Sequence, residues 1–186
     1  MQGAINKKSL VSSIATLLFV QIILLLAPVS SIAQKDTVNK RLHIAVFTPL
    51  YLDSAFDVSG TYRHGKTIPK HLAAGLDFYE GIQIAIDSLQ REKQPMDIYI
   101  YDSRSSNKKL EMILAMDEIK SMDLLLGYVN MNEALQLART AASLKIPFVN
   151  CNLPNDAGVK NNPNYIILNP TIGTHCIGIY KFLQKN

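Results

Sequence analysis

The chain has 186 residues, with 19 Lys or Arg against 15 Asp or Glu, and a formal net charge of +4. This small excess, without a stripe of basic residues interleaved with aromatic ones, argues against nucleic acid as a partner. The length suits one domain with a core of its own, preceded by a leader.

The first 33 residues are typical of a secretory signal peptide. Lys7 and Lys8 precede the strongly apolar stretch Leu10–Leu26, and Ser31 and Ala33 are small residues of the kind that signal peptidase recognises. We therefore expect an exported, periplasmic protein that is cleaved after Ala33. The alternative is that Leu10–Leu26 remains as a membrane anchor, because its length approaches that of a bilayer span.

Five apolar runs follow the leader and predict strands: Leu42–Thr48, Met96–Tyr101, Leu124–Val129, Ile146–Asn150 and Tyr165–Leu168. Helical periodicity separates most of them, at about Leu76–Gln90, Leu110–Met122, Ala134–Ala142 and Thr174–Gln184. Alternating strands and helices are typical of a parallel sheet with helices on its faces. We predict an α/β fold: a doubly wound, parallel, five-stranded sheet in the flavodoxin-like order 2-1-3-4-5. Its middle should hold Ile44, Val46, Leu125, Phe148 and Ile166.

The domain boundaries follow from this pattern. Gln34–Arg41 is polar and suggests a flexible lead-in, and residues 42–186 form the predicted domain. Within that domain, Leu50–Ala74 is long for a strand-to-helix connection. It is either a solvated loop or a lid that contacts a ligand.

Parallel sheets of this kind bind ligands beyond the carboxyl ends of their strands, so the residues that follow the strands form the candidate site. The candidate ligand-binding residues are Tyr51, Asp102, Tyr128, Asn130, Asn132, Cys151 and Asn152. Asn and Tyr can bind a polar solute without the burial of a net charge, and the backbone N–H groups of Met131–Glu133 could receive a carboxylate. The alternative is ordinary turn chemistry, because Asn, Asp and Ser are favoured in turns.

Enzyme signatures are missing from the sequence. It has no Gly-x-Gly-x-x-Gly fingerprint, no Walker-type phosphate loop and no Gly-x-Ser-x-Gly elbow. Its four histidines lack carboxylates or cysteines at metal-ligand spacing. We expect no catalytic activity, no metal and no cofactor. Cys151 and Cys176 could pair in an exported protein, but spacing does not establish the Cα separation that a bridge needs, so we expect free thiols.

Several segments, in order, resemble the amino-terminal lobe of type I periplasmic binding proteins, the superfamily of the branched-chain amino-acid receptors. The matching segments are Ile44–Leu50, Phe78–Asp87, Tyr99–Asp102, Asp123–Gly127 and Ala141–Val149. The resemblance implies an exported solute-binding lobe, related to the amino-acid and small polar solute receptors of ABC transporters. Its partners would be such a solute and a membrane permease.

The candidate site departs from that family. Its receptors have small hydroxyl residues after the third strand and commonly an Arg after the fifth, where this chain has Tyr128–Asn132 and Leu168–Pro170. The alternative is therefore a non-transport envelope interaction or regulatory module that reuses the fold. Residues 34–186 match one lobe only, and one lobe leaves a bound solute open to water, so we expect affinity no better than about millimolar.

Overall fold

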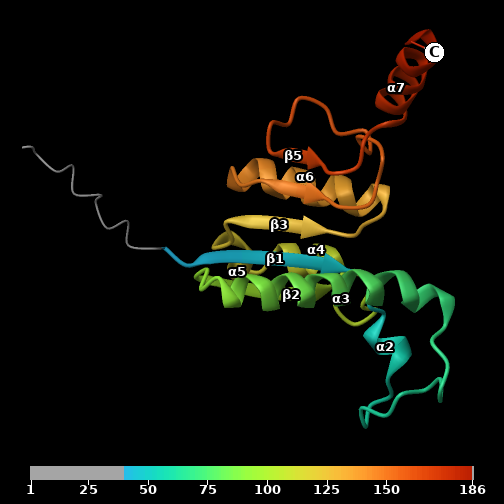
Figure 1. The fold of residues 1–186 in the computed structure, drawn as a ribbon. Coiled ribbons are helices and arrows are strands. Elements are labelled where there is room, and N and C mark those ends of the chain that lie inside the picture. The colour runs from blue at the N-terminus through green and yellow to red at the C-terminus, as the bar shows by residue number, and fades with distance from the viewer. Residues whose placement is uncertain (1–39, 186) are drawn as a thin grey trace, which may run out of the picture. The chain divides into compact units, whose positions relative to one another are not determined.

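The computed structural model describes residues 40–185, so the predicted signal peptide and residues 34–39 of the lead-in lie outside it. The elements are β1 (Leu42–Thr48), α2 (Leu52–Ala55), α3 (Lys70–Arg91), β2 (Met96–Asp102), α4 (Leu110–Leu114), α5 (Asp117–Lys120), β3 (Leu124–Gly127), α6 (Met131–Leu144), β4 (Phe148–Asn150), β5 (Tyr165–Ile167) and α7 (Ile172–Lys185) (Figure 1). Residues from Lys40 onward form a compact unit. Between Lys40 and Lys185, no helix combines the length and the apolar character needed to cross a membrane.

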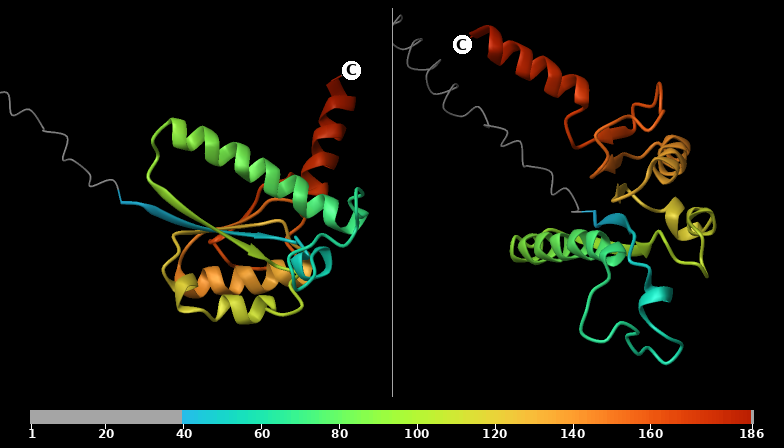
Figure 2. Two further views of the ribbon diagram at one scale, coloured as in Figure 1. Left: turned by 90° about the horizontal axis from the view of Figure 1, so that it is seen from below. Right: turned by 90° about the vertical axis from the view of Figure 1, so that its right-hand side faces the viewer.

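The five strands are all parallel and form one sheet in the order β2-β1-β3-β4-β5, which confirms the predicted topology. Helix α3 lies on one face, and α4, α5 and α6 lie on the other (Figure 2). The carboxyl ends of the strands are level with one another, because Thr48 pairs with Asp102 and Gly127 pairs with Asn150. The loops that carry the candidate site therefore leave from the same edge of the sheet.

The core lies between the sheet and α4–α6. Phe47, Leu125 and Phe148 are fully buried there against Ile119 and Leu137. Three of the five predicted central residues, Val46, Leu125 and Phe148, are buried, and Ile44 is half-buried.

The prediction was wrong for Ile166, which is 44% exposed. This residue lies on the edge strand β5, on the face that carries α3, and α3 packs over β1 at the other side of the sheet.

Two helices differ from the sequence pattern. Helix α3 begins at Lys70, six residues before the predicted start, because its first turns pack onto the sheet: Leu72 is buried and Gly75 lies against Pro49. The pattern over 110–122 is two short helices, α4 and α5, because Met116 is extended and caps the second. Asp117 and Glu118 then occupy the first turn of α5, where the helix dipole favours acidic residues.

Candidate functional site

Asp102 lies at the centre of the candidate edge, which is the edge of the sheet at the carboxyl ends of the strands. Its carboxylate accepts hydrogen bonds from the protein's own backbone. Oδ1 accepts hydrogen bonds from the backbone N–H groups of Leu50 (3.0 Å), Tyr51 (3.1 Å) and Arg104 (2.9 Å). Oδ2 accepts one from Leu52 N (2.8 Å). Three of these donors follow β1 and the fourth follows β2, so Asp102 ties the two segments together.

The same carboxylate holds Tyr51 in an unusual backbone conformation. Tyr51 precedes α2 with φ 53° and ψ 40°, the left-handed region that bulky residues rarely adopt. Strain of this kind costs on the order of 1 kcal/mol and occurs often at functional sites. The hydrogen bonds that Leu50, Tyr51 and Leu52 donate to Asp102 stabilise this backbone conformation.

Asn130 begins α6 with a capping box. Its Oδ1 accepts from Glu133 N (2.9 Å), and the Glu133 carboxylate accepts from Asn130 N (2.8 Å). Glu133 is only 7% exposed and forms an ion pair with Arg104 (Nε to Oε1, 2.8 Å). Burial raises the pKa of Glu133, and the Asn130 N–H and Arg104 partly offset that increase.

The Arg104–Glu133 pair was missed by the sequence reasoning. Arg104 follows β2 and Glu133 lies in α6, so nothing in their spacing indicates contact. Arg104 Nε has no hydrogen bond despite its short distance to the Glu133 oxygen, and Ser103 Oγ beside it is buried with no hydrogen-bond partner among residues 40–185.

The side chain of Asn152 also joins two loops through hydrogen bonds to the backbone. Its Oδ1 accepts from Val129 N (2.8 Å) and its Nδ2 donates to Val129 O (2.9 Å), which joins the loops after β3 and β4. Cys151 is half-buried, and burial raises the pKa of its thiol, so the unreactive protonated form is favoured. Cys151 and Cys176 are both free thiols, as expected.

Two tyrosines face the same side of α3. Tyr51 makes an edge contact with His71 (ring centroids 5.3 Å apart), and Tyr128 packs on Phe78 (5.6 Å). His71 and Phe78 are seven residues apart, so they lie on one face of the helix, about 10.5 Å apart along its axis. Gly75 lies between them and brings the helix against Pro49. The two tyrosine rings thus border the edge of the sheet between β1 and β3.

The hydroxyl groups of Tyr51 and Tyr128 have no hydrogen-bond partner within residues 40–185, and neither does the side-chain nitrogen of Asn130. Asn132 is exposed on the first turn of α6. The structure therefore gathers the predicted residues at one edge but divides them by role. Asp102, Asn152 and the side-chain oxygen of Asn130 fix the loops, whereas the tyrosine hydroxyls, the side-chain nitrogen of Asn130 and the Asn132 side chain make no hydrogen bond within residues 40–185.

The long connection after β1 is folded. Asp57 Oδ1 accepts from Ser59 N, Ser59 Oγ and Thr61 N, and Phe56 and Tyr62 form an antiparallel bridge. An apolar cavity of about 240 Å³ lies within it, lined by Leu50, Leu52, Ala55, Phe56, Tyr62, Ile68, Leu72 and Leu76. The connection is thus a folded segment beside the candidate edge.

Asp53 joins this connection to the loop after β2. Its Oδ2 accepts hydrogen bonds from Ser106 N (2.7 Å), Asn107 N (3.0 Å) and the hydroxyls of Ser105 and Ser106. The Asn107 N–H, followed by the two serine hydroxyls, lowers the pKa of Asp53 to about 2. Together with Asp102, it gives the candidate edge two carboxylates that act as anchors.

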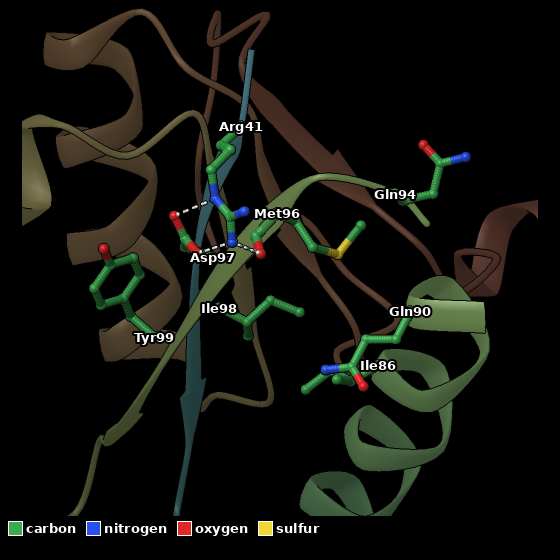
Figure 3. A pocket seen from close by; sticks show the side chains of 8 residues that line it. All are labelled: Arg41, Ile86, Gln90, Gln94, Met96, Asp97, Ile98 and Tyr99. Carbon is green, nitrogen blue, oxygen red and sulfur yellow. Dashed lines mark hydrogen bonds and ion pairs between the residues drawn. The ribbon is translucent and has the colours of Figure 1, made fainter. Parts of the chain in front are cut away.

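The amino edge of the sheet carries a separate cavity of about 470 Å³. Figure 3 shows the residues that line it: Arg41, Ile86, Gln90, Gln94, Met96, Asp97, Ile98 and Tyr99. Its two charged groups are paired with each other, because Arg41 Nε donates to Asp97 Oδ2 (3.0 Å). This hydrogen bond lowers the pKa of Asp97.

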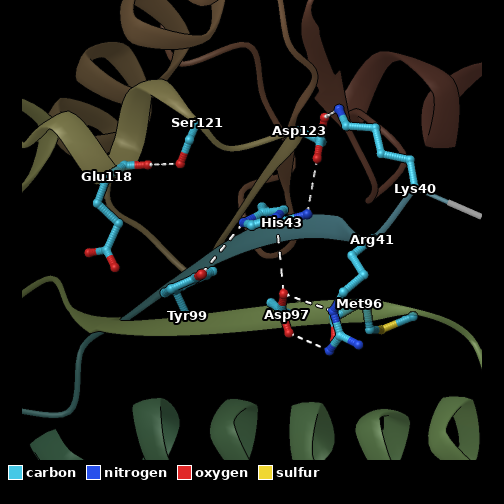
Figure 4. Close-up of polar contacts among 9 residues, drawn as sticks. All are labelled: Lys40, Arg41, His43, Met96, Asp97, Tyr99, Glu118, Ser121 and Asp123. Carbon is cyan, nitrogen blue, oxygen red and sulfur yellow. Dashed lines mark hydrogen bonds and ion pairs between the residues drawn. The ribbon is translucent and has the colours of Figure 1, made fainter.

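A network of polar contacts continues from Arg41 and Asp97 to Lys40, His43 and Asp123 at the start of β1 (Figure 4). Lys40 contacts Asp123 (2.6 Å), and Asp123 also accepts from His43 N (3.0 Å). The His43 ring lies between Tyr99 and Asp97, with Nδ1 3.5 Å from the tyrosine oxygen. These contacts join the start of β1 to β2 and to Asp123, the residue that precedes β3.

Within residues 40–185, no three His, Cys, Asp or Glu side chains are grouped so that they could hold a metal ion. A scan against models of protein families found no match, nor did searches of the curated proteins and of the solved structures.

Proposed function

We propose that this chain is an exported lobe that binds a small polar solute, related to the amino-acid and polar-solute receptors of ABC transporters. One observation carries the proposal: two tyrosines with unused hydroxyl groups border the point between β1 and β3 where the strand order reverses. In open parallel sheets, ligands bind in the crevice at this point, beyond the carboxyl ends of the strands.

The chemistry of the edge favours a solute with acceptor groups. The available groups are the hydroxyls of Tyr51 and Tyr128 and the side-chain amides of Asn130 and Asn132, all of which can donate. The carboxylates of Asp102 and Glu133 are already satisfied by backbone N–H groups or by Arg104. A carboxylate or carbonyl on the solute would meet several donors and no unpaired acid.

Export and a permease partner belong to the same proposal. They rest on the leader pattern at Lys7–Ala33 and on the segments that resemble the binding-protein lobe. One observation favours the alternative of an envelope interaction or regulatory module. Side-chain atoms of Asp102, Asn130 and Asn152 form hydrogen bonds with backbone groups at this edge, so its polar residues are partly structural.

Titration calorimetry of residues 34–186 against amino acids and other small polar solutes tests the proposal. We expect binding at about millimolar Kd, because a single lobe leaves the solute open to water. Tyr51→Phe and Tyr128→Phe keep the ring contacts and remove one donor each, so each should weaken binding about fivefold. Tyr180→Phe on the exposed helix α7 is the matched control and should bind as the unmodified chain does. Binding that is unaffected by both site variants would place the site elsewhere, and no binding across the panel would favour the interaction module.

A further inference from the structure

The apolar cavity of about 240 Å³ in the connection after β1 is separate from the groups assigned to the polar solute. Its lining side chains are aliphatic or aromatic, and their one polar atom, the hydroxyl oxygen of Tyr62, already donates to Thr67 O (2.9 Å). A buried water needs about two to four polar partners, and cavities lined by Leu, Ile and Phe stay dry. The lining therefore suits an apolar occupant better than it suits water.

The mouth of this cavity is bordered by large apolar side chains that remain exposed. Leu52 is 45% exposed, Phe56 40% and Ile68 58%, whereas Ala55 and Leu72 in the same lining are buried. A single exposed apolar side chain is ordinary on a protein surface. Here three of them, from α2, from the residue that ends it and from the segment before α3, border one hollow with a buried floor. An occupant of the cavity would remove all three from water.

The backbone around the cavity is fixed by contacts of its own. Phe56 and Tyr62 form an antiparallel bridge, and their rings lie 5.6 Å apart. Arg63 N donates to Ala55 O (2.9 Å), and Arg63 Nε donates to Phe56 O (3.0 Å). The two sides of the cavity are thus joined before any ligand arrives, and a preformed site lowers the entropic cost of binding.

We propose that this cavity binds a small uncharged apolar molecule, aromatic or branched aliphatic, at a site distinct from the polar groups of Tyr51 and Tyr128. An engineered cavity of about 150 Å³ with a similar lining binds benzene. A cavity of about 240 Å³ therefore has room for one ring with a short alkyl substituent. The lining contains no charged side chain, so a charged molecule would lose hydration there without gaining a partner.

A titration of residues 34–186 with toluene, followed by NMR of methyl groups, tests the site. This part of the chain is suitable because residues from Lys40 onward form a compact unit with its own core. We expect a Kd of about millimolar, because the mouth leaves part of the probe in contact with water. The signals that shift saturably should be those of the lining leucines Leu50, Leu72 and Leu76.

Three variants locate the binding. Ile68→Asp places a charge at the exposed mouth and should weaken toluene binding about tenfold, since the loss of one methylene-sized apolar contact has an effect of this order. Val58→Asp is the matched control, because it adds the same charge at a fully exposed position of the same connection outside the lining. It should bind toluene as the unmodified chain does. Ala55→Leu fills the cavity from its buried side and should abolish the saturable shifts.

Far-UV circular dichroism checks that each variant is folded, and Ile68→Asp decides the test if Ala55→Leu does not fold. An unmodified chain whose leucine methyl signals do not respond to toluene overturns the proposal. Equal binding by Ile68→Asp and Val58→Asp also overturns it. Benzylamine, which carries a charge on the same ring, should leave these signals unchanged, and shifts as large as those with toluene would contradict an apolar site.

Discussion

Gly75→Ala should destabilise the fold at the point where α3 meets the candidate edge. A Cβ added at Gly75 would lie 2.1 Å from the carbonyl oxygen of Pro49 and 2.7 Å from its carbonyl carbon. Both are backbone atoms, so no side-chain rotation can relieve the clash. The helix would have to move away from the end of β1, which also carries the hydrogen bond from Thr48 Oγ1 to Gly75 O (2.9 Å).

The magnitude follows from three terms. Overpacking of this severity costs about 3 kcal/mol, and the loss of the buried hydrogen bond adds about 1 kcal/mol. The higher helix propensity of Ala returns about 1 kcal/mol. We therefore expect the free energy of unfolding to fall by about 3 kcal/mol, a large fraction of the stability of a domain of this size.

Gly81→Ala is the matched control, because Gly81 lies on the same helix with nothing within 4 Å of an added Cβ. It should raise the free energy of unfolding by about 0.5–1 kcal/mol. Urea unfolding followed by far-UV circular dichroism measures both, since the chain has no Trp for fluorescence. If Gly75→Ala came within 1 kcal/mol of Gly81→Ala, the close approach of α3 to Pro49 would be refuted.

Three further predictions concern the two anchoring carboxylates and export. Asp102→Asn should cost about 2 kcal/mol, because an amide nitrogen would face the N–H of Leu52. Asp97→Asn, at the other end of the same strand, should lower the free energy of unfolding by clearly less in the same urea assay, because its ion pair with Arg41 is exposed to solvent; equal costs would contradict the anchoring role of Asp102. The folded-state pKa of Asp53 is lowered to about 2, so its stabilisation should be present above about pH 4 and lost as the pH falls toward 2. In urea, the free energy of unfolding of the unmodified chain should exceed that of Asp53→Asn by at most about 1 kcal/mol, because this group is exposed. This difference should vanish as the pH falls from about 4 toward 2. A difference that does not change with pH would contradict the anchoring role of Asp53. Amino-terminal sequencing of protein from the native envelope should find Gln34 first, whereas intact Leu10–Leu26 in a membrane fraction would indicate the anchor.

The topology of the sheet was predictable because it depends on a pattern that the sequence displays directly. Apolar runs alternate with helical periodicity, and the connection rules leave few arrangements for such a series. The start of α3 was not predictable in the same way. Its first turns depend on the contact between Gly75 and Pro49, which are 26 positions apart, and helix propensity carries no information on such tertiary packing. The exposure of Ile166 depends likewise on where α3 packs, over β1 at the other side of the sheet, and not on the composition of β5.

The candidate site shows why residue type at a strand end is a weak guide to ligand chemistry. Asn and Asp are common at these positions both because they favour turns and because they can bind ligands, and the sequence does not distinguish the two uses. The structure distinguishes them atom by atom. Both oxygens of Asp102 and both polar atoms of Asn152 are used by backbone groups, whereas Asn130 uses its oxygen and keeps its nitrogen.

The groups that the fold does not use are the hydroxyls of Tyr51 and Tyr128 and side-chain amide groups of Asn130 and Asn132, all of which can donate, and this shapes what the proposed site can select. A solute with a carboxylate or carbonyl would meet the hydroxyls of Tyr51 and Tyr128, which are held by contacts to His71 and Phe78 on a single helix. A cationic group would have only the tyrosine and Asn132 oxygens as acceptors, because backbone N–H groups occupy the Asp102 oxygens and Glu133 is paired with Arg104. Among solutes of equal size, the proposed site should therefore prefer acids and amides over amines. Because both rings are positioned by α3, the shift of this helix in Gly75→Ala should weaken that preference together with the fold.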